Sequence, residues 1–181
     1  MVPRLRGRLG HPYLYADVCP STQRMLTDEH SEGAVALTEE QTEGRGRLGR
    51  TWHSPPGVSL LFSTLLEPPV ETARLPELTV VAGKALRTAI AHATSLDPEI
   101  KLPNDILIAG RKTAGILAEA REGRVVLGIG VNVNLAEEAL PEETATSLLV
   151  ETGSEVDRVE LLLEILDRLE QHYDRWTATA S

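Results

Sequence analysis

Arginines and glycines alternate in one short stretch of the chain, residues 41–50, which reads QTEGRGRLGR. Glycines let backbone amides approach a ligand closely, and arginine guanidinium groups hold phosphate or carboxylate through paired hydrogen bonds. Because the whole chain carries 27 acidic against 18 basic residues, this local positive charge would attract an anion. The stretch therefore predicts an anion-binding loop. A solvated surface loop is the alternative when the stretch is taken alone.

A second polar stretch joins the sequence KLPND at residues 101–105 to Lys112 and Gly115. Proline cannot donate to a sheet, so Pro103 should end a strand and leave Asn104 and Asp105 where side chains can face a cleft. A glycine inside the next expected strand, Gly115, often marks the close approach of a ligand. The simpler explanations are an Asx turn at residues 104–105 and an exposed strand start at Lys112.

Two asparagines end a third stretch, residues 128–134, which reads GIGVNVN. Their alternate spacing puts Asn132 and Asn134 on one face of a strand. Asparagine is unfavourable in strands, so we expect a specific partner for each, either a ligand or a structural hydrogen bond. The five histidines have no metal-ligand spacing, and the chain lacks the Walker and GxSxG motifs.

The elements that must position these residues follow from hydrophobic periodicity. Helices are expected at residues 22–30, capped by Ser21, and at 76–93 and 155–176. Residues 41–57 should form a long loop, with tight turns at 109–110 and 122–123. Strands are expected at residues 11–18, 34–39, 58–66, 100–102, 106–108, 113–120 and 125–133. This order predicts an α+β fold, a mixed β-sheet with helices packed on one face.

Length and composition restrict the class of protein. A chain of 181 residues predicts one domain over residues 1–181, with residues 1–10 as a flexible start. A net charge of −9 disfavours a dedicated DNA-binding protein, and 3% aromatic residues disfavour a surface that stacks many bases. The single cysteine, Cys19, indicates a reducing, cytoplasmic environment. The sequence contains no run of about 18 apolar residues, so no membrane partner is expected.

In order and spacing these stretches resemble the catalytic domain of biotin protein ligases, over about residues 13–176. Ser21-Thr22 resembles the family's Ser-Thr-Asn, and residues 41–57 resemble its biotin loop. Residues 101–105 resemble its Lys-Trp-Pro-Asn-Asp, residues 111–117 its lysine motif, and residues 128–132 its Gly-x-Gly-Ile-Asn strand. Gln23 and Leu102 depart from the usual Asn and Trp. We expect a monofunctional ligase without an N-terminal helix-turn-helix and without a C-terminal small β domain.

The resemblance implies that ATP activates biotin to biotinyl-5′-AMP and that biotin is then transferred to a lysine of a biotin carboxyl carrier protein. Mg²⁺ should accompany ATP, chiefly through phosphate oxygens. Catalytic roles are implied for Lys112, Arg47 and Asp105. The implied biotin site comprises Ser21, Thr22, Gln23, Gln41, Gly44, Arg45, Gly46, Arg47, Lys112 and Gly115. The implied ATP and adenylate site comprises Arg45, Arg47, Arg50, Trp52, Asn104, Lys112 and Asn132.

Three alternatives remain at this point. A related ligase would attach lipoate or octanoate through the same kind of adenylate. A non-catalytic module would bind biotin or its adenylate without turnover. An RNA-binding protein would use the glycine- and arginine-rich loop, which the acidic net charge opposes. A homodimer is compatible with the sequence, and no DNA partner is expected.

Overall fold

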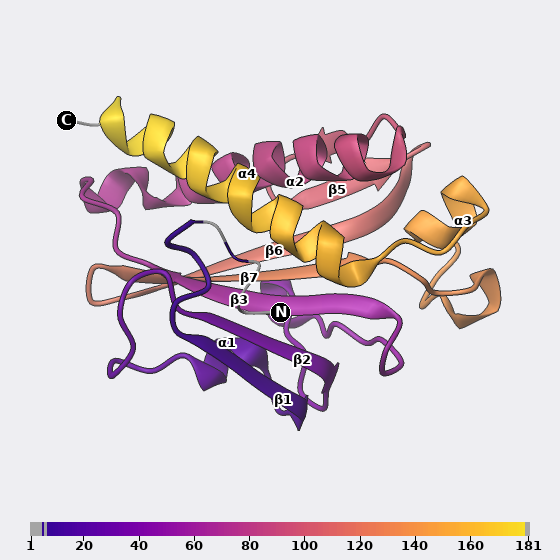
Figure 1. Cartoon of the computed structure of the whole chain (residues 1–181), viewed down its shortest axis with the longest axis horizontal. Coiled ribbons are helices and arrows are strands. Elements are labelled where there is room, and N and C mark those ends of the chain that lie inside the picture. Colours follow the sequence, from indigo (N-terminus) through magenta and orange to yellow (C-terminus); the bar gives the residue numbers. More distant parts are fainter. Residues whose placement is uncertain (1–4, 6, 180–181) are drawn as a thin grey trace.

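A computed structural model describes residue 5 and residues 7–179, which build one seven-stranded sheet (Figure 1). The strand order is β1-β2-β3-β7-β6-β5-β4. Only the β1–β2 pair is parallel among these strands, and the other neighbours are antiparallel. The strands are β1 (Tyr13–Cys19), β2 (Val35–Gln41), β3 (Ser59–Leu66), β4 (Glu99–Lys101), β5 (Asp105–Ile108), β6 (Arg111–Arg121) and β7 (Arg124–Asn132).

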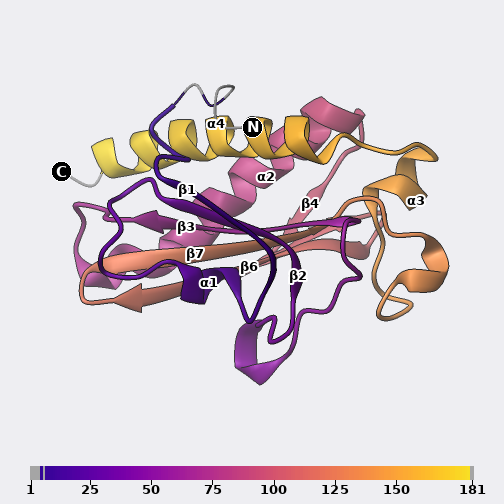
Figure 2. The same cartoon turned by 60° about the horizontal axis from the view of Figure 1, so that its bottom comes forward.

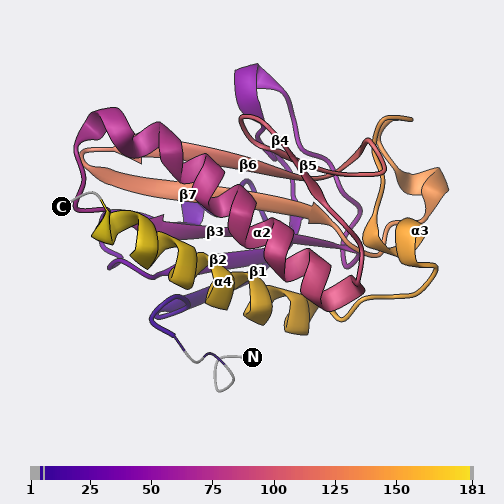
Figure 3. The same cartoon turned by 90° about the horizontal axis from the view of Figure 1, so that it is seen from above.

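Two long helices cover one face of this sheet, and a short helix lies on the other (Figures 2 and 3). The helices are α1 (Thr22–Met25), α2 (Leu78–Thr94), α3 (Leu148–Thr152) and α4 (Arg158–Ala178). The main core lies between α2, α4 and the sheet, and its apolar side chains recur at helical spacing along both helices. The predicted mixed sheet with helices on one face is thus confirmed for the long helices, while α1 lies on the opposite face.

Residues along the central strands β3 and β7 alternate between the two faces. Phe62 of β3 and Ile129 of β7 point into the main core under α2 and α4. Three of the intervening positions are small: Ser63 is the register partner of Gly128, and Gly130 is two residues further along β7. At these positions the face away from the long helices has little side-chain bulk of its own.

Both predicted hairpin turns are present. Ala109 and Gly110 have φ of 49° and 78°, and Glu122 and Gly123 have φ of 49° and 86°. Positive φ at both central residues is the geometry that matches the twist of the adjoining strands. The turns fix the register of β5, β6 and β7, and with it the residues that share a face.

The predicted helix 22–30 is wrong in length, since α1 ends at Met25. Leu26 is extended, with ψ of 115°, and its buried side chain packs with Ala34, Ala36, Leu65 and Val126. Ser21 precedes the helix, but its side chain makes no capping hydrogen bond.

Helix α3 was not expected from the sequence. It begins after Ser147, whose side chain accepts a hydrogen bond from the amide of Val150, and it ends at Gly153 in the left-handed region. Both residues are typical helix boundaries.

The start of the chain was expected to be flexible; residues 7–10 contact the rest of the fold, and residues 1–4 and 6 lie outside the described part. The Glu170 side chain of α4 accepts hydrogen bonds from the amides of Arg8 and Leu9. Leu9 is buried, and the Gly10 amide donates to the Gly33 carbonyl. In the described residues, no helix is both long and apolar enough to cross a membrane.

Candidate active site

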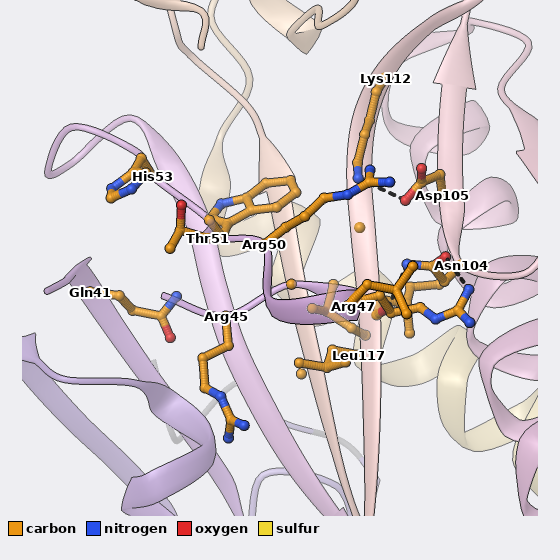
Figure 4. Close-up of a pocket in the computed structure, with 18 of the residues that line it drawn as sticks. Gln41, Arg45, Arg47, Arg50, Thr51, His53, Asn104, Asp105, Lys112 and Leu117 are labelled. Atoms are coloured by element: carbon orange, nitrogen blue, oxygen red, sulfur yellow. Dashed lines mark hydrogen bonds and ion pairs between the residues drawn. The ribbon is translucent and has the colours of Figure 1, made fainter. Parts of the chain in front are cut away.

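A cavity of about 800 Å³ lies beside the sheet, between the 41–57 loop and strands β6 and β7 (Figure 4). Nearly all the residues predicted to bind ligand line it, although they come from distant parts of the chain. These are Ser21, Thr22, Gln23, Gln41, Arg45, Gly46, Arg47, Arg50, Trp52, Asn104, Asp105, Lys112, Gly115 and Asn132. Gly44 is the exception: a Cβ there would lie 2.1 Å from the Trp52 carbonyl oxygen, so its role is to allow two backbone segments to approach.

Lys112 and Asp105 form the charged end of this cavity. Lys112 Nζ lies 2.8 Å from Asp105 Oδ1, and both side chains are mostly buried. The lysine backbone is held by a parallel bridge to Ala145: its amide donates to the Thr144 carbonyl, and its carbonyl accepts from the Thr146 amide. The lysine is therefore fixed in position by its main chain while its ammonium group faces the cavity.

Arg47 reaches the same end from the loop. Its Nη1 donates to Asn104 Oδ1 over 3.4 Å (Figure 4). Asn104 is itself fixed to β6, because its Nδ2 donates to the Ile116 carbonyl and its carbonyl accepts from the Ile116 amide. Of the two interpretations offered by the sequence, the cleft-facing side chain is the one observed at Asn104.

The opposite end of the cavity carries neutral hydrogen-bonding groups. Gln41 Oε1 accepts from the Thr22 amide at 2.9 Å and from the Thr22 hydroxyl at 3.2 Å. The Thr22 hydroxyl also lies 2.7 Å from that of Ser63, a fully buried residue of β3. Gln23 serves the fold instead, because its Nε2 donates to the Leu117 carbonyl at 3.0 Å and so ties α1 to β6.

The Trp52 indole lies on the floor of the cavity. Its ring covers Gly115 and Gly130, which are register partners on β6 and β7. A Cβ at Gly115 would lie 2.9 Å from the ring, and one at Gly130 would lie 2.7 Å from it. Gly115 was expected to admit a ligand, and the group that approaches it in this structure is the indole. Among the described residues, the buried Nε1 of Trp52 has no hydrogen-bond partner.

Arg45 was grouped with Arg47 in the predicted adenylate site, but the two point in different directions (Figure 4). Arg45 Nη1 pairs with Glu119 Oε1 at 2.8 Å, far along β6 from Lys112. Arg50 is directed from the loop into the cavity (Figure 4). Thus Arg47 and Arg50, rather than Arg45, share the cavity's charged end with Lys112.

The two asparagines that end the third stretch have structural partners. Asn132 Nδ2 donates to the Thr146 carbonyl at 3.0 Å, and Asn134 exchanges two hydrogen bonds with the Val156 backbone. Asn132 lines the cavity, whereas Asn134 lies beyond the end of β7. For Asn134 the expected partner is therefore a structural hydrogen bond. Asn132 makes a structural hydrogen bond and also lines the cavity.

The cavity is positively charged in an acidic protein. Its lining contains two carboxylates, those of Asp105 and Glu142. Basic side chains outnumber them: Arg45, Arg47, Arg50, Lys101 and Lys112. Such a concave site attracts anions from solution.

The nearby Cys19 has a raised pKa because it is buried, so its thiol is not activated as a nucleophile.

Sequence reasoning did not single out three contributors to the site. Ser63 lies in an apolar strand. The available signal was that successive strand residues alternate between two faces, so Ser63 faces away from Phe62 and Thr64. The glycines Gly128 and Gly130 were noticed only as part of a motif. The segment around Pro141 and Glu142 carries no signal, because its place depends on the backbone bridge to Lys112.

Comparisons with known proteins agree with this geometry. The model of the biotin/lipoate A/B protein ligase family matches residues 15–135. The bifunctional ligase/repressor BirA of Bacillus subtilis is 38% identical over 177 residues, which is 91% of this chain and 54% of the relative. The biotin–[acetyl-CoA-carboxylase] ligase of Mycobacterium tuberculosis is 36% identical over 151 residues, covering 80% of this chain and 56% of that protein.

A similar solved structure is that of biotin protein ligase from Aquifex aeolicus in complex with biotin and ATP. Its TM-score is 0.84 at 35% identity, and the match covers 92% of this chain and 72% of that chain. The chain spans about half the length of the curated relatives it matches. With a family model that matches most of its length, the chain belongs to the biotin/lipoate A/B protein ligase family.

Proposed function

We propose that this chain activates biotin with ATP to biotinyl-5′-AMP and transfers biotin to a lysine of a biotin carboxyl carrier protein. The observation that carries the proposal is the polarity of the cavity. Neutral hydrogen-bonding groups of Thr22 and Gln41 lie at one end, and Lys112 and Arg47 lie at the other. Biotin has the same polarity, with a neutral ureido ring at one end and a carboxylate at the other.

In the first step a biotin carboxylate oxygen attacks the α-phosphorus of ATP, and pyrophosphate leaves. A carboxylate is ionised near neutral pH, so this step needs no general base. It needs cations where two anions meet, and in-line positioning. Lys112 bridges the carboxylate and the α-phosphate in this proposal, while Arg47 and Arg50 hold the phosphates. Asn104 orients Arg47.

In the second step the carrier lysine attacks the carbonyl carbon of the mixed anhydride, and AMP leaves as the amide forms. The attacking amine must first lose a proton. Asp105 is the carboxylate beside the reacting groups, and we assign it to assist that loss. The carrier is the biotin-accepting domain of acetyl-CoA carboxylase or a related carboxylase, in keeping with the name of the Mycobacterium tuberculosis relative.

Mg²⁺ fits this site as a companion of ATP. Among the described residues, no cluster of three or more His, Cys, Asp or Glu side chains offers a metal cage. Mg²⁺ commonly binds through substrate phosphates with one or two carboxylates. Asp105 is the carboxylate placed to contribute, and the bound metal would neutralise phosphate charge. We place the protein in the cytoplasm, which contains both ATP and carboxylases. The single cysteine, which cannot form an internal disulfide, agrees with this location.

The test is transfer to a recombinant carrier domain in the presence of ATP, MgCl₂ and biotin. Intact mass spectrometry should show one added biotinyl group, and none on a carrier whose acceptor lysine is replaced by arginine. Parallel reactions with lipoate and octanoate test the alternative ligase, which has no use for the Thr22–Gln41 pair. Pyrophosphate release without transfer would indicate adenylation alone. If neither pyrophosphate nor biotinylated carrier forms, the non-catalytic binding module is the remaining alternative.

A further inference from the structure

The hydroxyl of Ser63 lies behind the neutral end of the cavity. It is fully buried on β3, between the register partners Ala36 and Gly128, and it does not line the cavity itself. Its hydroxyl oxygen is 2.7 Å from that of Thr22, which does line the cavity. Ser63 is therefore placed to act on a ligand only through Thr22.

The direction of these hydrogen bonds follows from what each group can donate. The Thr22 amide donates to the Gln41 side chain, so the atom that faces it must be Oε1. That oxygen only accepts, so the Thr22 hydroxyl is the donor of the 3.2 Å hydrogen bond to it. The 2.7 Å contact between the two hydroxyls allows either to donate, and with the Thr22 proton directed to Gln41 the donor is Ser63.

We propose that Ser63 is a positioning residue that sets the polarity of the ligand site. With the chain of bonds fixed in this direction, Thr22 Oγ1 keeps one lone pair for a ligand. Gln41 Nε2 keeps its protons, because no hydrogen bond among the described residues engages it. The site offers an acceptor beside a donor, and its complement is a ligand with N–H beside C=O, as in a cyclic urea.

This inference rests on the proposed function, since biotin supplies such a ring. Without the Ser63 hydroxyl, the Thr22 proton would be free to turn toward the ligand. The site would then accept a ring oxygen in place of N–H with less penalty. A site built around a hydrogen bond discriminates against analogues that lack it, and that discrimination is the property Ser63 controls.

The experiment measures the affinity of the full chain for biotin and for the two cyclic carbamate analogues in which one ring N–H is replaced by oxygen. Calorimetry without ATP isolates binding from chemistry. Wild-type protein should prefer biotin over at least one carbamate. Ser63→Ala should reduce that preference about 2- to 12-fold, equivalent to about 0.5–1.5 kcal/mol for one neutral hydrogen bond. Ser63→Cys keeps a weak donor, so its preference should lie between those of wild-type protein and Ser63→Ala.

Thr64→Val is the matched control. Thr64 is the next residue on β3, is equally buried, faces away from the cavity, and its hydroxyl has no partner among the described residues. It should leave the preference unchanged. A double-mutant cycle then tests the route: in a Thr22→Val background, Ser63→Ala should have no further effect on the preference.

Three results would overturn the inference: wild-type protein that does not discriminate, an unchanged preference in Ser63→Ala, or an equal loss with and without the Thr22 hydroxyl. The last would mean that Ser63 only supports packing. If wild-type protein binds neither biotin nor the carbamates, the proposed function itself is wrong, and the inference falls with it. Melting temperatures of every variant, measured alongside, separate a change in ligand preference from loss of fold.

Discussion

Asp105 and Lys112 face one another across the β5–β6 hairpin, with their charged atoms 2.8 Å apart. A β-bulge between Ile106 and Leu107 shifts the register between the two residues. A carboxylate so close offsets the positive charge of the lysine ammonium group. The same pair thus keeps the ammonium group in place and lowers its attraction for unrelated anions.

Replacing Lys112 by alanine should block adenylate formation and leave the fold intact. A hydrogen bond to a charged group contributes about 1.5–3 kcal/mol, so the rate of pyrophosphate release should fall at least about 10- to 150-fold. Lys84→Ala, at an exposed position on α2, is the control and should retain full activity. Near-wild-type turnover by Lys112→Ala would remove the lysine from the proposed mechanism.

Gly130→Ala should displace the Trp52 indole, because the new Cβ would lie 2.7 Å from the ring. Overpacking of this kind typically costs about 1–3 kcal/mol. The chain has two tryptophans, so the side-chain indole N–H resonances report on each separately. The Trp52 signal should shift while that of Trp176 stays in place. Gly83→Ala, where the nearest atom would be 3.4 Å away, should leave both signals unchanged.

The Arg45–Glu119 ion pair fastens the 41–57 loop to β6. Glu119→Gln should make the loop amides exchange with solvent faster. The change in global stability should stay below about 1 kcal/mol, because the arginine is half exposed and solvent screens the pair. Hydrogen exchange resolved by mass spectrometry measures both effects, with Glu122→Gln in the adjoining exposed turn as control. Equal exchange in both variants would mean that other contacts hold the loop.

Glu77 makes stability depend on acidity. Hydrogen bonds from Arg74 and from the Trp176 indole lower the pKa of Glu77 from 4.5 to about 2. A lowered pKa in the folded state stabilises the protein above about pH 4.5, and this contribution is lost as the pH falls toward 2. Glu77→Gln should therefore melt earlier than wild type at pH 7.

The difference between the Glu77→Gln and wild-type melting temperatures should shrink through this acidic range and disappear near pH 2. Thermal melts followed by circular dichroism at several pH values give the comparison. Glu99→Gln, at an exposed position on β4, should show no such convergence. A difference for Glu77→Gln that persists unchanged at low pH would show that the Glu77 carboxylate does not cause the pH dependence.

The elements most visible in the sequence are those whose hydrophobic pattern is long and regular. The apolar strand at 58–66, the hairpins turned by Ala109-Gly110 and Glu122-Gly123, and the last helix were all predicted close to their observed limits. The first helix was overestimated because Leu26, which extends its apolar pattern, is buried in a separate cluster with Leu65 and Val126. A local pattern does not tell which of two clusters will bury a leucine.

The candidate site was likewise predictable where it depends on local sequence and not where it depends on tertiary packing. Residue types and their order were enough to select most of the residues that line the cavity. They were not enough to separate Arg45 from Arg47, since the difference depends on Glu119, which lies more than 70 positions along the chain. Nor did they reveal that the space above Gly115 and Gly130 is taken by Trp52. Such relationships arise only when the sheet brings distant strands together.

The alternation of β3 and β7 between two faces also has a consequence for protein engineering and for evolution. Phe62 and Ile129 hold the main core, while Ser63, Gly128 and Gly130 face the other side of the same strands. Substitutions restricted to the second set should alter ligand preference, provided that they stay small, because a Cβ would meet Gln23 at Gly128 and Trp52 at Gly130. The same diversity at the first set should yield mainly insoluble protein. Selection can therefore change what this sheet recognises at positions other than those that hold the main core.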